Sequence, residues 1–162
     1  MFSVESLIRC WNTETDICVA LFGKMPSGGL AYRPSPAQRD TLELLKYLSK
    51  GPRNGVIRVV AGDWAATPPA MDMAKDMPPS DFPRQMHLQA EEVARVLRAA
   101  NPGDLEHGTM SFPWGETFTK MDALIHYPYR WLTGYRMQLF LYLKAAGASQ
   151  LATPDLWRVP KA

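Results

Sequence analysis

The stretch LIHYPYRWLTGYRMQLFLYLKAAG, residues 124–147, decides the fold because it is the longest run in the chain that is compatible with a helix. Apolar and aromatic residues recur in it at spacings of three and four, which places them along one side of a helix. These residues are Pro128, Trp131, Leu132, Tyr135, Leu139, Tyr142 and Ala146. Gly147 is a good end for the helix, because glycine readily adopts the left-handed conformation of a helix cap. The remainder of the chain must cover this apolar stripe.

The composition limits the classes of protein to be considered. The chain has 162 residues, 46% hydrophobic and 21% charged, so we expect a single domain over residues 1–162 with a buried core. The net charge of +2, without a cluster of lysines and arginines, argues against a nucleic-acid partner. The sequence contains no signal-peptide pattern and no apolar run of about 18 residues, which indicates a cytoplasmic protein without a membrane partner.

Capping residues and apolar periodicity predict three long helices before the last one. Ser3 can cap the first helix, Ser35 followed by proline opens the second, and Ser80 opens the third. The predicted ranges are about 4–24, 36–50 and 80–100, and Gly51-Pro52 ends the second helix.

The last helix is predicted to begin at Thr119, which together with Asp122 resembles a capping box. Pro128 lies inside this helix and removes a backbone donor, so we expect a kink one turn before Trp131. The tail, residues 148–162, is apolar enough to dock on the other helices but too short for a long element.

Residues 54–62, NGVIRVVAG, favour a strand by propensity because they are rich in β-branched side chains. No other run of comparable strength is available to pair with them, and an isolated strand would leave its backbone groups unpaired, so we predict a short helix. Residues 62–79 and 104–118 are rich in proline, glycine and turn residues and are predicted to be irregular connections. The sequence therefore predicts an all-α bundle of four helices with one short extra helix and no sheet.

Several segments resemble the DinB-like (DinB/YfiT) superfamily. Residues 135–139, YRMQL, followed by YLK at 142–144 and by Gly147, resemble its terminal signature, in which a histidine, an arginine, any residue, a glutamine and a leucine precede a short aliphatic stretch. ELLKYLS, residues 43–49, is similar to the second-helix motif, and FPWGE, residues 112–116, is similar to the segment before the last helix. The order and length of the helices match over nearly the whole chain.

This resemblance implies a four-helix bundle with a long crossover connection. Members of the superfamily are often dimeric and commonly carry a metal ion held by three histidines. Characterised members include metal-dependent thiol transferases and related hydrolases or isomerases.

The chain departs from this pattern at the three ligand positions. The second-helix histidine falls on Tyr47, and the last-helix pair, four residues apart on one face, falls on Trp131 and Tyr135. A phenol is a poor ligand for a divalent metal at neutral pH because its pKa is near 10, and the indole nitrogen donates a hydrogen bond without accepting one. We therefore expect the inherited metal site to be absent.

The three histidines of the chain offer an alternative metal site. His87, His107 and His126 are far apart in the sequence and contain no pair at the spacing of four that would place two imidazoles on one helix face. They would have to converge through the tertiary structure. Scattered histidines are usually surface residues or hydrogen-bonded core residues, which is the simpler interpretation.

Two acidic and aromatic pairs lie in the predicted connections and could line the mouth of a pocket. They are Asp63 with Trp64, and Trp114 with Glu116. The simpler interpretation is that both tryptophans cover the ends of the bundle. Other reaction classes lack their motifs, because the chain has no GxSxG sequence, no P-loop and no dinucleotide fingerprint.

Two classes of function follow. In the first, the protein is a metal-free relative whose former metal pocket, lined by Tyr47, Trp131 and Tyr135, binds a small apolar or aromatic molecule or is filled by side chains. In the second, it is a metal-dependent transferase or hydrolase of the thiol-S-transferase type, with zinc or nickel at a relocated site. The loss of all three ligands favours the first class and no cofactor. The sequence assigns no catalytic residue and leaves enzymatic activity undecided.

The apolar surplus also bears on partners. Met137, Phe140 and Leu141 lie off the main stripe of the last helix, and such a surplus is usually buried by a second subunit, so we predict a homodimer. A third class of function is an interaction module, which would bind a partner protein through these apolar residues and the nine methionines.

Overall fold

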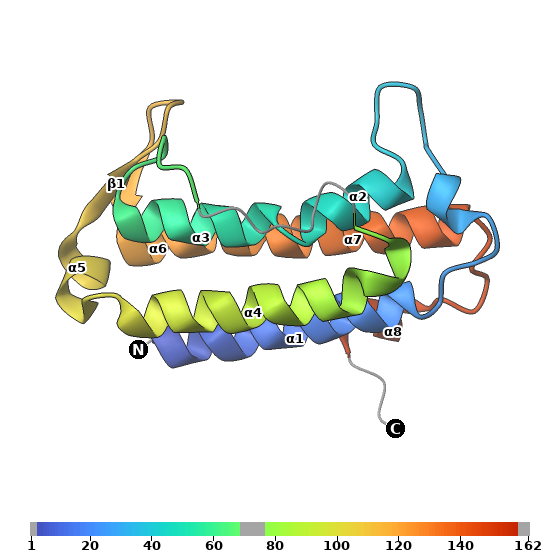
Figure 1. The fold of residues 1–162 in the computed structure, drawn as a ribbon, viewed down its shortest axis with the longest axis horizontal. Helices are drawn as coiled ribbons and strands as arrows, with labels where there is room; N and C mark the ends of the chain where they lie inside the picture. The colour runs from blue at the N-terminus through green and yellow to red at the C-terminus, as the bar shows by residue number, and fades with distance from the viewer. Residues whose placement is uncertain (1–2, 69–76, 159–162) are drawn as a thin grey trace.

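A bundle of helices forms the body of the molecule. The computed structural model of the chain describes residues 3–68 and 77–158. Figure 1 shows two layers: α1 (Val4–Phe22) lies beside α4 (Phe82–Ala99), and the pair α2 (Thr41–Leu48) and α3 (Gly51–Ala61) lies beside the last helical run. That run consists of α6 (Lys120–Leu124), the π-helical segment η3 (Ile125–Tyr129) and α7 (Arg130–Ala145). The predicted helical bundle is confirmed.

The direction of the helices explains the long crossover. In Figure 1, α3 and α4 run in the same direction along the bundle. The connection between them therefore has to lead from the end of the bundle where α3 ends to the end where α3 begins. This connection includes the short helix η2 (Pro79–Asp81), and part of the irregular segment predicted over 62–79 lies outside the described residues. None of the helices within the described ranges is long and apolar enough to cross a membrane.

The second predicted helix, residues 36–50, was too long. The turn η1 (Gly29–Ala31) and irregular backbone precede α2, which begins only after Asp40, because Asp40 and Glu43 form a reciprocal capping box. Gly51 and Pro52 do not merely end a helix; they begin α3, where a proline in the first turn costs no hydrogen bond. The helix predicted over 54–62 in place of a strand is therefore confirmed as part of α3.

A buried glutamine joins the two helices at the break between α2 and α3. Gln89 of α4 is fully buried; its amide nitrogen donates to the Leu48 carbonyl at 3.0 Å and its amide oxygen accepts from the Arg53 backbone nitrogen at 3.2 Å. One side chain thus satisfies a donor and an acceptor that the end of one helix and the start of the next leave open.

Replacing Gln89 by leucine is expected to lower the free energy of unfolding by about 1–3 kcal/mol, since it leaves buried polar groups without a partner while keeping the volume. Urea unfolding followed by circular dichroism measures this loss. Glu91→Gln, at an exposed position of the same helix, is the control and should change stability by less than about 0.5 kcal/mol. Equal stability of the two variants would show that the Gln89 bridge contributes nothing.

The expectation of an irregular connection over 104–118 and of no sheet is wrong. Asn101 caps a further short helix, α5 (Pro102–His107), and the chain then forms an antiparallel hairpin of β1 (Thr109–Ser111) and β2 (Thr117–Thr119). Each strand has only three residues, too few to give a periodic signal. Met110 of β1 is 1% exposed and belongs to the hydrophobic core, so the hairpin packs against the bundle.

The last helical run confirms its predicted start and end. The Thr119 side chain accepts from the Asp122 backbone nitrogen at 3.2 Å, and Gly147, after α7, has a φ of 109°. Pro128 lies within η3, so the wider π-helical turn accommodates the residue that has no amide hydrogen to donate.

The assignment of faces on α7 was partly wrong. Phe140, expected at a subunit interface, is 7% exposed within this chain, and Arg136 is 2% exposed. Leu141 is 55% exposed and Met137 is half-buried. The apolar surplus on this face is therefore smaller than the sequence indicated, and the homodimer stays a prediction.

Candidate functional site

Tyr47 and Tyr135, two of the three residues at which the resemblance implies metal ligands, meet between α2 and α7. The ring centroids of Tyr47 and Tyr135 are 4.7 Å apart and their planes are inclined by 59°. Both side chains are half-buried, so part of each ring is accessible from outside. Gly51, at the start of α3, makes room for this arrangement, because a Cβ atom there would lie 2.9 Å from the ring of Tyr47.

Trp131, the third residue at which the resemblance implies a ligand, lies one turn before Tyr135 and packs in another direction. Its ring centroid lies 5.7 Å from that of Trp64, and its ring lies 3.3 Å from the place where a Cβ atom of Gly55 would be. Gly51 and Gly55 thus let Tyr47 and Trp131 approach the backbone of α3. We call the surface formed by Tyr47, Trp131 and Tyr135 the aromatic site.

Two arginines that sequence reasoning missed adjoin the aromatic site. The guanidinium carbon of Arg39 lies 4.4 Å from the ring centroid of Tyr47 and 5.9 Å from that of Tyr135. The Arg39 carbonyl accepts a hydrogen bond from the Tyr142 hydroxyl at 3.1 Å, which ties the irregular backbone before α2 to α7. No spacing signal could have identified Arg39, because it precedes the helix and its ring partners are set by tertiary packing.

Arg58 of α3 is the second cation. Its guanidinium carbon lies 5.4 Å from the ring centroid of Trp64, and its Nε donates to the Ala66 carbonyl at 3.1 Å. The sequence placed Arg58 on a predicted helix but did not indicate the face on which it would lie.

The electrostatic environment keeps Tyr47 protonated. Burial raises the pKa of Tyr47, and the neighbouring Tyr135, to which it is hydrogen-bonded, raises this pKa further. Arg39 and Arg58 oppose the rise because a cation favours the phenolate. At neutral pH Tyr47 is thus a neutral hydrogen-bond donor, and this protonated form is unsuitable for coordinating a metal.

The predicted pocket-mouth residues lie in an aromatic cluster between the hairpin and η3. The ring centroids of Trp64 and Trp114 are 5.4 Å apart, and that of Tyr127 lies 5.0 Å from Trp114. Trp114 Nε1 donates to Glu116 at 3.0 Å, and the Tyr127 hydroxyl also donates to this carboxylate. The hydrogen bond from Tyr127 lowers the pKa of Glu116 most, and the hydrogen bond from Trp114 lowers this pKa further. Three of the four predicted residues are thus together.

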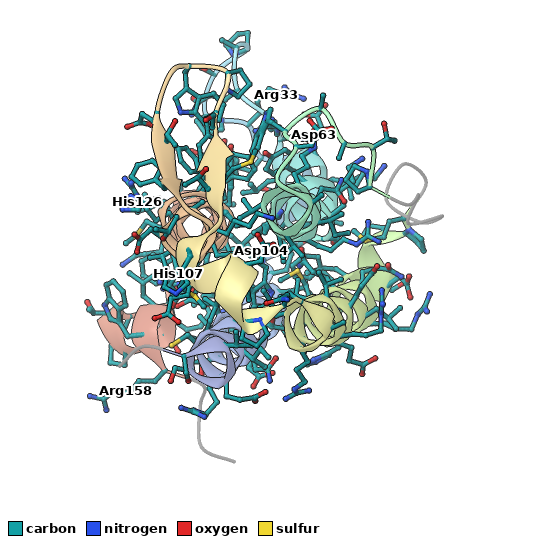
Figure 2. All side chains as sticks on the ribbon, turned by 90° about the vertical axis from the view of Figure 1, so that its left-hand side faces the viewer. Arg33, Asp63, Asp104, His107, His126 and Arg158 are labelled. Carbon is teal, nitrogen blue, oxygen red and sulfur yellow. The ribbon has the colours of Figure 1, made fainter. Side chains whose placement is uncertain are left out.

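Asp63, the fourth pocket-mouth residue, does not join this cluster. It is exposed just after α3, and its carboxylate accepts from the Ala65 backbone nitrogen at 2.8 Å. Figure 2 looks onto this end of the molecule and shows Asp63 at the end of α3, away from the hairpin. A short polar side chain that bonds two residues ahead is typical of a turn, so Asp63 has a local structural role.

The three histidines are exposed and lie on different elements. His87 is on α4, His107 on α5 and His126 in η3, where its ring stacks on Phe118 at a centroid distance of 4.5 Å. Figure 2 shows His107 and His126 at the hairpin end as separate positions. Across residues 3–68 and 77–158, no three His, Cys, Asp or Glu side chains are grouped so that they could hold a metal ion.

Comparisons with known proteins agree with the geometry of the bundle. No family model matches the sequence, and no curated protein matches it in sequence. Among solved structures, a DinB-like protein from Bacillus subtilis matches 91% of this chain and 96% of its own chain, with a TM-score of 0.69 and 13% sequence identity. The resemblance inferred from residues 135–139 and from the order of the helices is confirmed at the level of the fold. This chain has the DinB-like fold.

Proposed function

We propose that this protein is a metal-free DinB-like bundle protein that binds a small aromatic molecule at the aromatic site. The observation that carries the proposal is the pair of half-buried rings, Tyr47 and Tyr135, at two positions where the resemblance implies metal-ligating histidines. Aromatic faces that keep accessible area can stack with a ligand ring and bury its apolar surface. The half-buried Trp131, on the same helix as Tyr135, extends this surface toward Trp64.

The charges beside the aromatic site support a metal-free function. The Arg39 guanidinium already lies 4.4 Å from the centroid of the Tyr47 ring, and its charge would repel a divalent cation. The side chains at positions 47, 131 and 135 supply two phenols and an indole, none of which is a good ligand for such an ion. The alternative class, a metal-dependent transferase or hydrolase with a relocated site, requires ligands other than these three residues.

The proposal is tested with 2-naphthamide and 2-naphthoate, two aromatic probes of nearly equal shape. We expect at least one of them to bind the protein, as measured by ligand-observed NMR and titration calorimetry. Tyr135→Ala is expected to weaken this binding about tenfold, equivalent to about 1.4 kcal/mol, because it removes a stacking face. Tyr135→Phe keeps the ring and should retain binding.

Trp157→Ala is the matched control, since Trp157 is an aromatic residue of the terminal helix α8 (Thr153–Trp157) and is 57% exposed. It should bind the probes as the unmodified protein does. If Tyr135→Ala binds the probes as tightly as this control, the aromatic site is not the binding site.

A further inference from the structure

Six arginines of the described residues form an ion pair with a carboxylate. Those with such a partner are Arg33, Arg53, Arg84, Arg95, Arg98 and Arg136. Arg39 and Arg58 form no ion pair with a carboxylate of the described residues, as is also true of the exposed Arg9, Arg130 and Arg158, but Arg39 and Arg58 lie against aromatic rings. Arg39 lies over the rings of Tyr47 and Tyr135, and Arg58 lies over the ring of Trp64, which packs on Trp131, so the aromatic site and its border combine aromatic faces with two cations.

We propose that the ligand of the aromatic site is an aromatic carboxylate, whose ring stacks on Tyr47 and Tyr135 and whose anionic group is bound by Arg39 and Arg58. This inference rests on the proposed function of the site and adds the chemical class of the ligand. A guanidinium group has five donors in a planar fork that matches the two oxygens of a carboxylate.

The geometry of Arg39 leaves this fork available. Arg39 is exposed, and its guanidinium contacts the tyrosines through their ring faces. A guanidinium group contacts an aromatic ring through its flat face, whereas it donates hydrogen bonds to a carboxylate through the N–H groups at its edge. The two interactions can therefore form together. Arg58 uses Nε for the Ala66 carbonyl, and its two terminal nitrogens supply further donors.

The charges around Tyr47 also favour an anionic ligand over a cationic or neutral one. Tyr47 is a neutral phenol that is hydrogen-bonded to Tyr135, and the charged groups that act on it are the cations Arg39 and Arg58. A cationic ligand would be repelled by both arginines, and a neutral aromatic ligand would leave their charges uncompensated. An aromatic carboxylate satisfies the rings and the cations together.

The experiment compares 2-naphthoate with 2-naphthamide on three proteins: the unmodified chain, the double variant Arg39→Gln/Arg58→Gln, and the control Arg9→Gln. Arg9 is exposed on α1 and its removal changes the net charge without touching the site. The unmodified protein and Arg9→Gln should bind the carboxylate at least tenfold more tightly than the amide. The double variant should lose this preference while its affinity for the amide changes less than twofold.

The outcomes separate the two proposals. Equal affinities for carboxylate and amide in the unmodified protein, both lowered by Tyr135→Ala, would overturn the anionic ligand class and keep the aromatic site. A carboxylate preference that survives in Arg39→Gln/Arg58→Gln would also overturn it. If neither probe responds to Tyr135→Ala, the proposed function itself fails. Weaker carboxylate binding at higher ionic strength, with unchanged amide binding, would support the arginine contacts.

Discussion

Replacing Arg136 by methionine is expected to lower the free energy of unfolding by about 3–5 kcal/mol, the largest loss we expect from a single substitution. The Arg136 side chain is 3% exposed, and its Nε donates to Glu14 of α1, whose side chain is 11% exposed. Arg136 also donates to the Leu156 carbonyl, and its guanidinium lies 4.9 Å from the ring centroid of Trp157. The substitution leaves the Glu14 carboxylate buried without its cation and releases the tail.

The pH dependence identifies the cause of this loss. Burial raises the pKa of Glu14 above its ordinary value, and the charge of Arg136 opposes the rise. In Arg136→Met this opposition disappears, so folded Glu14 binds a proton at higher pH than the unfolded chain does. The variant should therefore gain stability as the pH falls toward the unfolded pKa of about 4.3. Urea unfolding at pH 8 and pH 5 measures the difference.

The matched control removes both charges. Glu14→Leu/Arg136→Met should recover most of the stability, because replacing a buried ion pair by apolar side chains of similar volume is often neutral or stabilising. A loss in Arg136→Met that is the same at pH 8 and pH 5, or that the double variant shares, would show that lost packing rather than the unpaired carboxylate is responsible.

Placing histidines at positions 47, 131 and 135 is expected to create a metal site. The triple variant Tyr47→His/Trp131→His/Tyr135→His places two imidazoles four residues apart on α7 opposite a third on α2, where the parent rings of Tyr47 and Tyr135 are 4.7 Å apart. Zinc at a hundred times its dissociation constant should then stabilise the folded state by about 2.7 kcal/mol. Thermal unfolding with zinc or with EDTA measures this gain.

Two controls accompany this prediction. The unmodified protein should contain no stoichiometric divalent metal by elemental analysis and should show no shift of its melting temperature with zinc or nickel. The variant Trp131→His/Tyr135→His, which lacks the histidine on α2, should gain much less than the triple variant, because a third ligand is missing. If the unmodified protein holds one equivalent of metal that a substitution of His87, His107 or His126 releases, the relocated metal site replaces our proposal.

The parts of the fold that could be predicted from the sequence are the helix ends, because the residues that cap a helix lie within one helical turn of each other. Ser3 caps α1 through the Ser6 nitrogen, Thr119 caps α6, and Gly147 follows α7 with positive φ. Each of these interactions joins residues close in sequence, so residue type and spacing reveal it. The hairpin escaped prediction for the opposite reason: its three-residue strands are too short to show a period, and the bundle supplies their packing.

The aromatic site shows the same division. The resemblance pointed to Tyr47 and Tyr135, and the structure brings their rings together, while Trp131 packs on Trp64. Arg39 lies in an irregular segment before α2, and nothing in its neighbours in the sequence indicates a position over two tyrosine rings. The chemical character of the surface, and hence the proposed ligand class, depends on this tertiary contact.

The sequence by itself determined most helix starts and ends and the aromatic residues at 47, 131 and 135, because capping, periodicity and residue identity are local properties. Only the tertiary structure decided that Arg136 is buried against Glu14 while Arg39 lies exposed over Tyr47. Two arginines with the same side chain received opposite environments, since the packing of segments distant in the sequence determines which partner each cation meets and how much water it loses.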